Sequence, residues 1–334
     1  MILVTGGSGL VGSHLLYHLL KQHDTVKAIC RRSSDLEAVK TVFSYYGDDY
    51  LKIFAKIRWL EVDLHDIPSL ESAFDGITKV YHCAALVSFD SADYQKMRRV
   101  NIEGTTNIVN LCIEYNVEKL CFVSSVAAIE NKAEEEIIDE SDNWNSNTDK
   151  SGYAITKYGA ELEVWRCSQE GIPVVVVNPG VILGSGHWSK GSGNLFNRVD
   201  KGLPFYTEGV TGFVGVHDVV KIMILLMDSE IKNERYILVS QNLSFKELLY
   251  NIAEELKKKK PRIRIGKGLS EFVWRFEFFK SKILLSTPLL TKYTARSSIS
   301  KHPYSSEKIE KTLNYNFEQI SDCVKRISLN FRKL

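Results

Sequence analysis

Glycine spacing near the amino terminus constrains this chain more than any other feature. The run TGGSGLVG spans residues 5–12, after an apolar stub at residues 2–4 and before a helical pattern of leucines. A strand, a glycine turn and a helix N-terminus in that order form a site for a pyrophosphate. We expect Gly6 to permit the tight turn, Gly9 to let the backbone approach the phosphates, and Gly12 to let the helix pack closely on the sheet. An ordinary glycine loop is the alternative.

Composition places the chain among globular proteins and argues against several partners. The 334 residues are 44% hydrophobic and 25% charged, with a formal charge of +2, which gives no electrostatic reason to expect nucleic acid. No uncharged run approaches the ~20 residues that span a bilayer, so we expect no stable membrane insertion. Six cysteines without metal-ligand spacing predict no metal site and a reducing compartment, the cytoplasm.

Short apolar runs alternate with helical patterns from residue 1 to about residue 178. This alternation predicts an α/β fold, with a doubly wound parallel sheet covered by helices on both faces. The expected strands are residues 2–4, 26–30, 57–60, 79–83, 120–124 and 174–178, and the expected helices are residues 11–21, 68–75, 98–116 and 152–170. Such sheets bind ligands outside the carboxyl ends of their strands, where we expect the functional residues.

The character of the chain changes after Pro179. Residues 184–194 are rich in glycine and serine, which indicates a loop, and residues 217–229 resemble another helix. Residues 235–239 form a candidate strand that rejoins the sheet. We therefore predict a dinucleotide-binding domain at 1–178, rejoined by 213–240, and a smaller, mostly helical substrate-binding lobe at 179–212 and 241–334.

Two features of this C-terminal part allow more than one interpretation. Residues 269–285 (LSEFVWRFEFFKSKILL) place apolar side chains near helical spacing, with basic ones between them. We expect this segment to pack over the substrate pocket or in the lobe core, with a membrane-surface helix as the alternative. Asp218 precedes an apolar helix and is predicted to be an N-cap rather than a catalytic group.

A phenol and an ammonium group lie four residues apart in the run Tyr153-Ala-Ile-Thr-Lys157. On a helix these two side chains are neighbours. A free tyrosine, with a pKa near 10, is a poor acid–base catalyst at neutral pH, but a nearby positive charge lowers that pKa. The pair alone is weak evidence, because the same spacing is frequent on amphipathic helices.

Hydroxyl groups at the end of the preceding strand strengthen the case for chemistry. The strand at 120–124 ends in Ser124 and Ser125. A hydroxyl at the carboxyl end of a strand can hydrogen bond a substrate carbonyl, whereas the structural alternative is that both serines cap or turn the chain. We favour the structural interpretation for Ser124 and a functional one for Ser125.

The chain resembles an extended short-chain dehydrogenase/reductase over nearly its whole length. The resemblance rests on TGGSGLVG, on Ser125, Tyr153 and Lys157, and on four further motifs: Asp63-Leu64, His82-Cys83-Ala84-Ala85, the helix from Asn101 to Asn107, and Asn178-Pro179-Gly180. It implies a Rossmann fold and an NAD(P) cofactor. The last motif falls where that family contacts the nicotinamide carboxamide.

The resemblance also implies roles for the residues. Tyr153 would exchange a proton with the carbonyl oxygen, Lys157 would lower the tyrosine pKa and hold the nicotinamide ribose, and Ser125 would polarise the carbonyl. Asn101 stays outside this catalytic set, as a residue that positions a water or the backbone. The expected cofactor contacts are Gly6, Ser8, Gly9, Leu10, Val11, Gly12, Arg31, Arg32, Asp63, Leu64, Cys83, Ala84, Ala85, Tyr153, Lys157, Pro179 and Val181.

The end of the second strand bears on the choice between NAD and NADP. Sites that prefer NAD carry an acid there, on the ribose 2′-hydroxyl. This chain has Arg31 and Arg32 instead, and a guanidinium can pair with a 2′-phosphate through two hydrogen bonds. We expect NADP as the cofactor, with NAD possible, although both arginines could also be solvent-facing loop residues.

Departures from the nucleotide-sugar enzymes of the family bear on the reaction class. Those enzymes tend to show an arginine and a tyrosine-glycine pair after the sixth strand, where this chain reads VVNPGVILG at 176–184. Sugar dehydratases place an acidic dyad beside the catalytic serine, whereas Ser125 is followed by Val-Ala-Ala. The pattern is similar to the branch that holds dihydroflavonol reductases and hydroxysteroid dehydrogenases. It lacks the aromatic motif of cinnamoyl-CoA reductases around Tyr153.

The sequence thus predicts an NADP-dependent oxidoreductase that interconverts a ketone or aldehyde and an alcohol by hydride transfer. A nucleotide-sugar epimerase or dehydratase, which would hold NAD through its catalytic cycle, is the alternative. A nucleotide sensor without catalysis is a third hypothesis, and the intact serine, tyrosine and lysine argue against it. We expect a small-molecule carbonyl or alcohol substrate. Relatives suggest a homodimer through the helices at 98–116 and 152–170.

Overall fold

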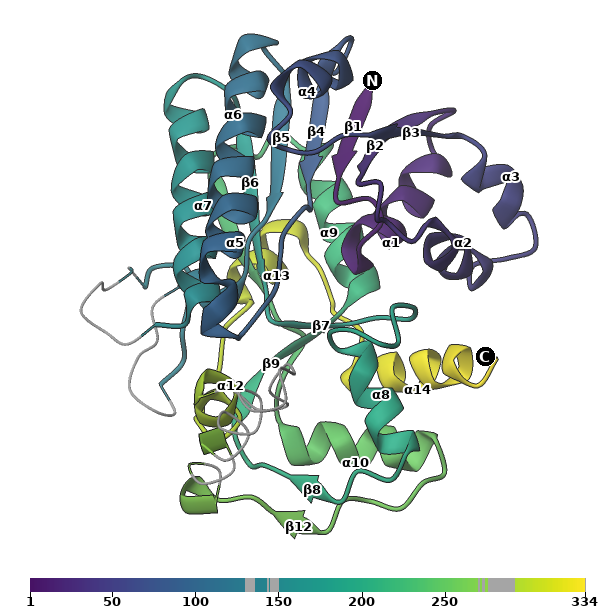
Figure 1. Cartoon of the computed structure of the whole chain (residues 1–334), viewed down its shortest axis with the longest axis vertical. Helices are drawn as coiled ribbons and strands as arrows, with labels where there is room; N and C mark the ends of the chain where they lie inside the picture. The colour runs from purple at the N-terminus through teal and green to yellow at the C-terminus, as the bar shows by residue number, and fades with distance from the viewer. Residues whose placement is uncertain are drawn as a thin grey trace.

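The core of the protein is a seven-stranded sheet in which every neighbouring pair of strands is parallel. The computed structural model describes residues 1–129, 136–142, 144, 150–269, 271, 274–275 and 292–333. The strand order is β10-β6-β5-β4-β1-β2-β3 (Figure 1). The strands are β1 (Ile2–Thr5), β2 (Val26–Cys30), β3 (Ile57–Glu61), β4 (Lys79–His82), β5 (Lys119–Val123), β6 (Val174–Pro179) and β10 (Glu234–Leu238).

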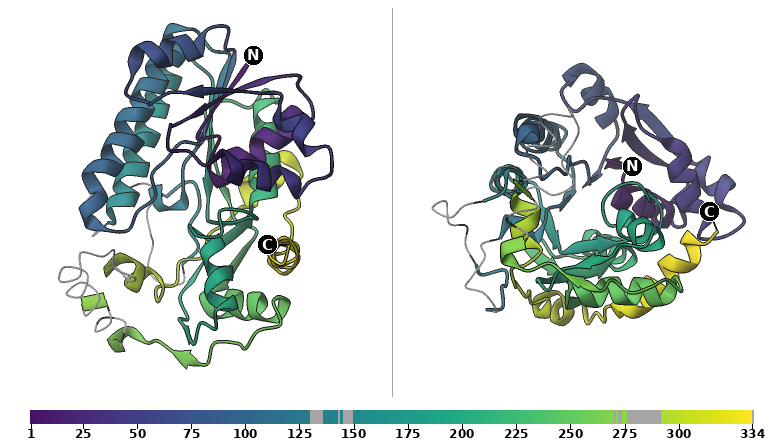
Figure 2. Two further views of the ribbon diagram at one scale, coloured as in Figure 1. Left: turned by 45° about the vertical axis from the view of Figure 1, so that its right-hand side comes forward. Right: turned by 60° about the horizontal axis from the view of Figure 1, so that its bottom comes forward.

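Helices cover both faces of this sheet because its central strands are apolar on both sides. Alternate residues of β5 enter two separate cores: Cys121 faces one, and Leu120 and Phe122 face the other. Figures 1 and 2 show α6 and α7 side by side on one face, and α1 against α9 on the other. The flanking helices are α1 (Leu10–Leu20), α2 (Leu36–Ser44), α3 (Tyr50–Phe54), α4 (Ile67–Phe74), α5 (Tyr94–Arg98), α6 (Gly104–Glu114), α7 (Gly152–Gln169) and α9 (Val216–Met227). The predicted doubly wound Rossmann sheet is confirmed.

The expected helix at 98–116 is interrupted. Residues Arg99–Glu103 form a π-helical turn between α5 and α6. Asn101 lies buried in this turn, where its side chain accepts from Leu86 N (2.7 Å) and donates to Leu86 O (3.0 Å). A π turn inserts an extra residue and re-aims side chains, and it is frequent near functional sites. Asn101 therefore fixes the backbone of the loop after β4.

The C-terminal part adds two small sheets and further helices. A three-stranded sheet has the order β11-β9-β7, and a two-stranded sheet pairs β12 with β8. Its own apolar core lies among α8, α10 and α14. The elements are β7 (Val181–Leu183), α8 (Gly193–Asp200), β8 (Phe205–Tyr206), β9 (Val210–Gly215), β11 (Gln241–Ser244), α10 (Phe245–Glu255), β12 (Ile263–Arg264), α12 (Lys292–Ser297), α13 (Glu307–Leu313) and α14 (Ile320–Phe331). The predicted segment 269–285 lies largely outside the described residues.

Asp218 does not cap its helix, so that prediction is wrong. The N-cap of α9 is Gly215, and Asp218 lies within the first turn. Its carboxylate accepts from the Tyr315 hydroxyl (2.7 Å) and from Glu318 N (3.1 Å). Because these donors precede α14, the carboxylate fastens the C-terminal segment to the main sheet. No local sequence pattern points to donors about a hundred residues away.

Two buried histidines join elements across the fold in their neutral form. His82 is fully buried between the hydroxyls of Thr5 (2.6 Å) and Thr105 (2.8 Å). His14 on α1 contacts Ser185 O (3.0 Å) and the Tyr46 hydroxyl (2.5 Å). Burial lowers the pKa of each imidazole to about 3, so neither gains a proton in the folded state at mildly acidic pH.

We predict that this pair makes the fold acid-sensitive. Below pH ~6.5 the unfolded chain protonates both rings while the folded chain does not, so stability present above that pH is lost as the pH falls toward 3. Each ring contributes a loss of up to about 1.4 kcal/mol per pH unit in that window. Urea unfolding from pH 7 to pH 4.5 measures the slope, which His14→Gln should reduce and His23→Gln, at an exposed position, should not. A slope that is equal in all three proteins would contradict the prediction.

Candidate functional site

The glycine turn lies where the strand order reverses, between β1 and β4. Gly6 has a φ of +67°, and a Cβ there would lie 2.6 Å from Ala84 N, so only glycine lets the turn contact the end of β4. A Cβ on Gly12 would lie 2.2 Å from Gly6 O. Gly12 thus allows α1 to pack against the turn itself, rather than against the sheet as expected. This reversal point is where parallel sheets bind ligands.

The first turn of α1 is open to an anion. Gly9 is the N-cap and offers no side-chain cap, and the first turn holds no acid. The first N–H groups of a helix lack partners within it, so those of Leu10, Val11 and Gly12 can bind phosphate oxygens. A Cβ on Gly9 would meet only Gly6 O, at 3.3 Å. The turn therefore fits the pyrophosphate of a dinucleotide.

The end of β2 carries two exposed cations next to this turn. Ser8 Oγ donates to Ser34 Oγ (3.0 Å), which also accepts from Arg31 N (3.0 Å). This chain of hydrogen bonds joins the glycine turn to the segment that holds Arg31 and Arg32. Within the described part of the chain, neither guanidinium forms an ion pair. Their charges are therefore available to a ligand.

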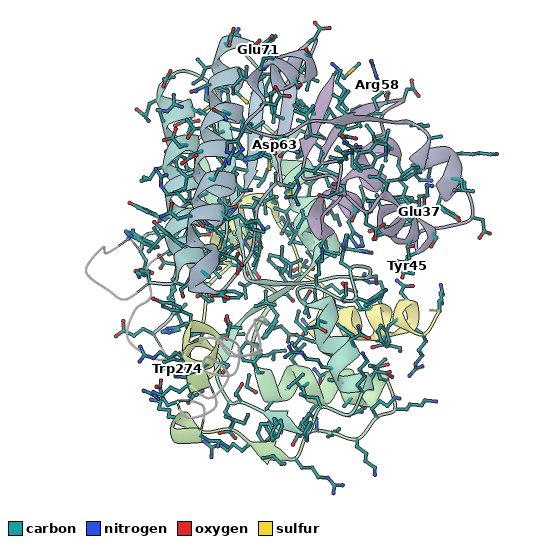
Figure 3. All side chains as sticks on the ribbon, in the orientation of Figure 1. Glu37, Tyr45, Arg58, Asp63, Glu71 and Trp274 are labelled. Atoms are coloured by element: carbon teal, nitrogen blue, oxygen red, sulfur yellow. The ribbon has the colours of Figure 1, made fainter. Side chains whose placement is uncertain are left out.

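The other expected cofactor contacts follow β3, β4 and β6. Asp63 is exposed, and its carboxylate accepts from His65 N (2.9 Å) and His65 Nδ1 (3.0 Å), hydrogen bonds that lower its pKa (Figure 3). Both hydrogen bonds reach the same carboxylate oxygen, Oδ1, which ties the Asp63 side chain to His65. Leu64 and Pro179 are buried, Cys83, Ala84 and Val181 are partly buried, and Ala85 is exposed. Burial raises the pKa of the Cys83 thiol to about 12.

The structure brings Ser125 and Tyr153 together. Ser125 follows β5 and Tyr153 lies in the first turn of α7, where the Ser125 hydroxyl is close enough to the phenol to affect its pKa. Burial raises the pKa of Tyr153, and the Ser125 hydroxyl opposes that effect. The phenol therefore holds its proton at neutral pH in the form shown here. A hydroxyl and a protonated phenol that lie close together can both donate hydrogen bonds to one carbonyl oxygen.

Lys157 lies one turn further along α7, nearly fully buried. Its Nζ donates to Val123 O (2.7 Å) and lies 4.4 Å from the centre of the Phe122 ring. Burial lowers its pKa to about 8, against the opposing effects of Glu161 and Cys83. An ammonium has three donors, so two remain for a ribose or for Tyr153 after the bond to Val123.

Ser124 has a structural role, although not the expected cap. Its Oγ donates to Glu161 Oε2 (2.6 Å), and both residues are buried. Glu161 is not recognisable from the sequence, because a glutamate on a helix is ordinarily solvated. Its spacing from Lys157, one helical turn, was the only available signal. Asn178 also donates to this carboxylate (2.9 Å), and its Oδ1 is buried without a partner in the described part of the chain.

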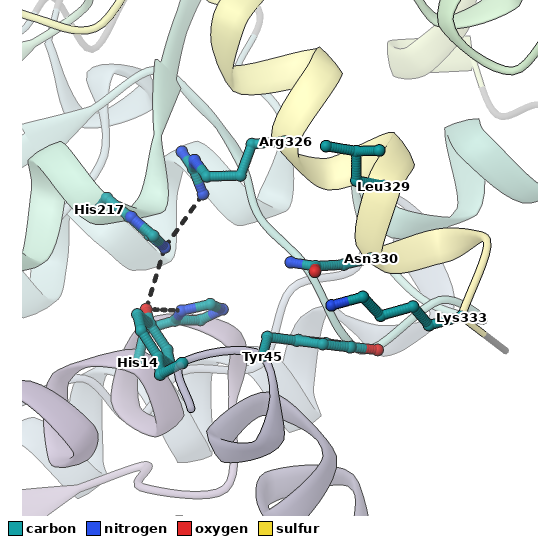
Figure 4. Close-up of a pocket in the computed structure, with 8 residues that line it drawn as sticks. His14, Tyr45, His217, Arg326, Leu329, Asn330 and Lys333 are labelled. Atoms are coloured by element: carbon teal, nitrogen blue, oxygen red, sulfur yellow. Dashed lines mark hydrogen bonds between the residues drawn. The ribbon is translucent and has the colours of Figure 1, made fainter. Parts of the chain in front are cut away.

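A cavity of about 270 Å³ lies away from the catalytic candidates, between α1, the end of α2, α9 and α14 (Figure 4). A chain of contacts runs along it from His14 through the Tyr46 hydroxyl to His217 (3.0 Å) and Arg326 (3.0 Å). Arg326 also pairs with Glu318 (2.5 Å). These polar groups form hydrogen bonds and an ion pair with one another. We therefore interpret the cavity as a gap where the N-terminal and C-terminal parts pack together, and not as a ligand site.

Two further observations concern metals and membranes. Among the described residues, no group of three or more histidines, cysteines or acids is arranged to hold a metal ion. No helix in the described part of the chain combines the length and apolarity needed to cross a membrane.

The fold and the site define a dinucleotide-binding α/β protein with serine, tyrosine and lysine at the strand ends. The family described as "NAD dependent epimerase/dehydratase family" matches residues 2–238. The chain belongs to this family, and it is an NAD(P)-dependent enzyme of the extended short-chain dehydrogenase/reductase type.

Curated relatives include reductases. A "Putative dihydroflavonol 4-reductase" of Synechocystis sp. is 30% identical over 75% of this chain and 71% of its own length. "Sterol demethylase protein B" of Methylococcus capsulatus is 28% identical over 80% of this chain and 78% of its own. "Anthocyanidin reductase" of Arabidopsis thaliana is 28% identical over 80% and 82%. These similarities indicate an NAD(P)-dependent oxidoreductase.

Solved structures confirm the fold over the whole chain. The crystal structure of gox2253 has a TM-score of 0.81 and 25% identity, covering 100% of this chain and 98% of that one. A UDP-glucose 4-epimerase of Thermotoga maritima, solved with UDP-glucose, has a TM-score of 0.78 and 19% identity, covering 99% and 98%. At that identity the second likeness concerns the fold alone.

We predict that Gly12→Ala weakens cofactor binding at least tenfold. The added Cβ would lie 2.2 Å from Gly6 O, which forces the helix N-terminus away from the turn that holds the pyrophosphate. Fluorescence titration with NADPH and NADH should show affinity at least tenfold weaker, since losing even one charge-assisted hydrogen bond costs about 1.5–3 kcal/mol. Gly266→Ala is the control, because a Cβ there meets nothing within 4 Å. Wild-type affinity in Gly12→Ala would refute the prediction.

Proposed function

We propose that this enzyme is an NADP-dependent oxidoreductase that interconverts a ketone or aldehyde and an alcohol by hydride transfer. The observation that carries the proposal is that Ser125, directly after β5, and Tyr153, in the first turn of α7, lie close enough for the Ser125 hydroxyl to lower the pKa of the phenol. A substrate carbonyl placed there would accept from both hydroxyls.

The chain's own residues divide the acid–base work. Tyr153, protonated at neutral pH, donates its proton to the carbonyl oxygen as the alcohol forms, and takes it back in the reverse direction. Ser125 donates a hydrogen bond to the same oxygen, where negative charge develops. Lys157 holds the ribose hydroxyls and supplies the positive charge that stabilises a phenolate. The nicotinamide, when bound, supplies or accepts the hydride.

An apolar wall beside the phenol supports a carbonyl substrate with an apolar body. The ring of Phe89 lies 5.7 Å from that of Tyr153, and Phe89 and Val87 remain 42% and 59% exposed. Asn101 anchors the start of the loop that presents them, through hydrogen bonds to both backbone groups of Leu86. An exposed apolar surface next to a catalytic group favours an apolar ligand over a sugar. A nucleotide-sugar epimerase or dehydratase is the second candidate, favoured only by the family relationship.

Several further assignments complete the proposal. Residues 179–212 and 241–334 form the lobe that covers the substrate, and residues 1–178 with 213–240 bind the cofactor. Partly exposed Ile155 and Leu162 on the outer side of α7 support a homodimer through α6 and α7. Six free cysteines support a reducing compartment such as the cytoplasm.

The experiment that tests the reaction is an NADPH-oxidation screen over ketones, aldehydes and nucleotide sugars. Removing the proton donor in Tyr153→Phe should lower kcat roughly 10²- to 10⁴-fold on the best substrate, with NADPH affinity nearly unchanged. Tyr158→Phe, on the same helix, is the matched control and should keep full activity. Stoichiometric NADPH consumption indicates a reductase, whereas turnover of a nucleotide sugar without net consumption indicates the second candidate. Unchanged activity in Tyr153→Phe would refute both enzyme mechanisms.

Cofactor choice is tested at the end of β2. We expect Arg31→Asp to weaken NADPH binding roughly tenfold to hundredfold, because a charge-assisted hydrogen bond to the 2′-phosphate is worth about 1.5–3 kcal/mol. NADH binding should be retained, since NADH has no such phosphate. The control is Arg58→Asp on the exposed side of β3 (Figure 3), which removes the same charge from the same sheet. An unchanged preference for NADPH over NADH in Arg31→Asp argues against NADP specificity through this residue.

A further inference from the structure

A buried carboxylate lies directly behind the catalytic candidates. Glu161, on α7, is only 2% exposed. Four donors converge on it: Ser124 Oγ (2.6 Å), Asn178 Nδ2 (2.9 Å), Trp165 Nε1 (3.3 Å) and Arg235 Nη1 (3.3 Å). Burying a charge is costly unless it is paired and hydrogen bonded. Each oxygen of this side chain therefore accepts two hydrogen bonds within the protein.

This carboxylate joins the helix of Tyr153 and Lys157 to the strand ends that carry Ser125. Ser124, which donates to it, follows β5 directly. Asn178, near the end of β6, donates both to the carboxylate and to Ser125 O (3.0 Å). One turn earlier on α7, Lys157 Nζ donates to Val123 O. The backbone from Val123 to Ser125 is therefore held to α7 at successive residues.

The carboxylate also supplies the charge nearest to Lys157. Glu161 raises the pKa of Lys157, while burial lowers it to about 8. Arg235 lies on the far side of the carboxylate, where it also donates to Glu140 O (3.1 Å). The titratable and charged groups around Lys157 are Tyr153 and Glu161 on its own helix, His82 and Cys83 at the end of β4, and Arg235 and Glu140 beyond the carboxylate.

We propose that Glu161 is a positioning residue for the catalytic set, which fixes the Ser125 backbone against α7 and keeps Lys157 charged. Arg235 sets the strength of this effect by neutralising part of the carboxylate's charge. The inference rests on the proposed function, since it assigns Glu161 to the same hydride-transfer site. Neither residue belongs to the proposed substrate and cofactor contacts, so we assign both an action through other residues.

Two substitutions with opposite electrostatic effects test the proposal. Glu161→Gln removes the negative charge next to Lys157, so the lysine loses its proton more easily. The alkaline limb of the kcat/KM–pH profile should then move to lower pH by about one pH unit, and kcat should fall roughly tenfold or more with little change in KM. Arg235→Met removes the cation that partly neutralises the Glu161 carboxylate, so Lys157 holds its proton to higher pH. The alkaline limb of the profile of this variant should therefore move to higher pH.

Controls separate this role from a merely structural one. Loss of stability alone would lower activity in both variants without moving the two limbs in opposite directions. The double variant Glu161→Gln with Arg235→Met removes both charges and should return the limb toward its wild-type position. Glu163→Gln, a partly exposed glutamate on the same helix that pairs with Arg166 (3.0 Å), should leave the profile unchanged. Limbs that do not move, or that move in the same direction, would overturn the proposal.

A second readout distinguishes failure of this inference from failure of the proposed function. Lys157 is expected to bind the cofactor ribose, so the dissociation constant for NADPH, measured by fluorescence between pH 6 and pH 10, should show the same opposite displacements. If no carbonyl substrate is found but these displacements appear, the proposed reaction fails and the role of Glu161 stands. If the enzyme reduces carbonyls and both profiles are unmoved, the role of Glu161 fails alone. Should Glu161→Gln not fold, Arg235→Met and Arg235→Lys provide the same test, with only the former moving the limb.

Discussion

The contact between the glycine turn and the end of β4 is the constraint on which the rest of the site depends. Gly6 can approach the Ala84 backbone only because it has no side chain and adopts a left-handed conformation. That approach aims the N-terminus of α1 across the point where the strand order reverses. In the proposed mechanism, a dinucleotide anchored at β1 would extend past β4 toward the side chains that follow β5.

The chemistry at those strand ends depends on which buried groups keep a charge. His82, at the end of β4, is held neutral between two threonine hydroxyls, and so adds no positive charge beside Lys157. Lys157 remains the local cation because Glu161 opposes its desolvation. No charged group opposes the effect of burial on Tyr153. Burial outweighs the opposing effect of the Ser125 hydroxyl, so the pKa of the phenol is raised and the phenol stays protonated. Acid and cation therefore coexist on successive turns of one helix.

Local signals made much of this arrangement predictable. The strand predicted at 26–30 matches β2, and the strand predicted at 235–239 joins the sheet beside β6, because short, mostly apolar runs are typical of buried parallel strands. Ser125 and Tyr153 were expected together, and the structure places them in contact. Glu161 and Asp218 could not be assigned, because their partners lie far away in the sequence and a buried carboxylate looks like a solvated one until the fold surrounds it. The three-stranded sheet of β7, β9 and β11 was not predicted either, because its strands are also separated in the sequence.

The position of Lys157 shows how the same helix can serve structure and chemistry together. In the form described here its ammonium is bonded to Val123 O, and no effect of Lys157 on the phenol of Tyr153 is evident among the groups that alter that pKa. The expected lowering of the tyrosine pKa by the lysine therefore needs a further element between them. A ribose that accepts from both side chains would provide it, because hydroxyls donate and accept in chains that polarise one another. On this argument the phenol becomes an effective acid only when the cofactor is bound, which couples proton transfer to the presence of the hydride donor.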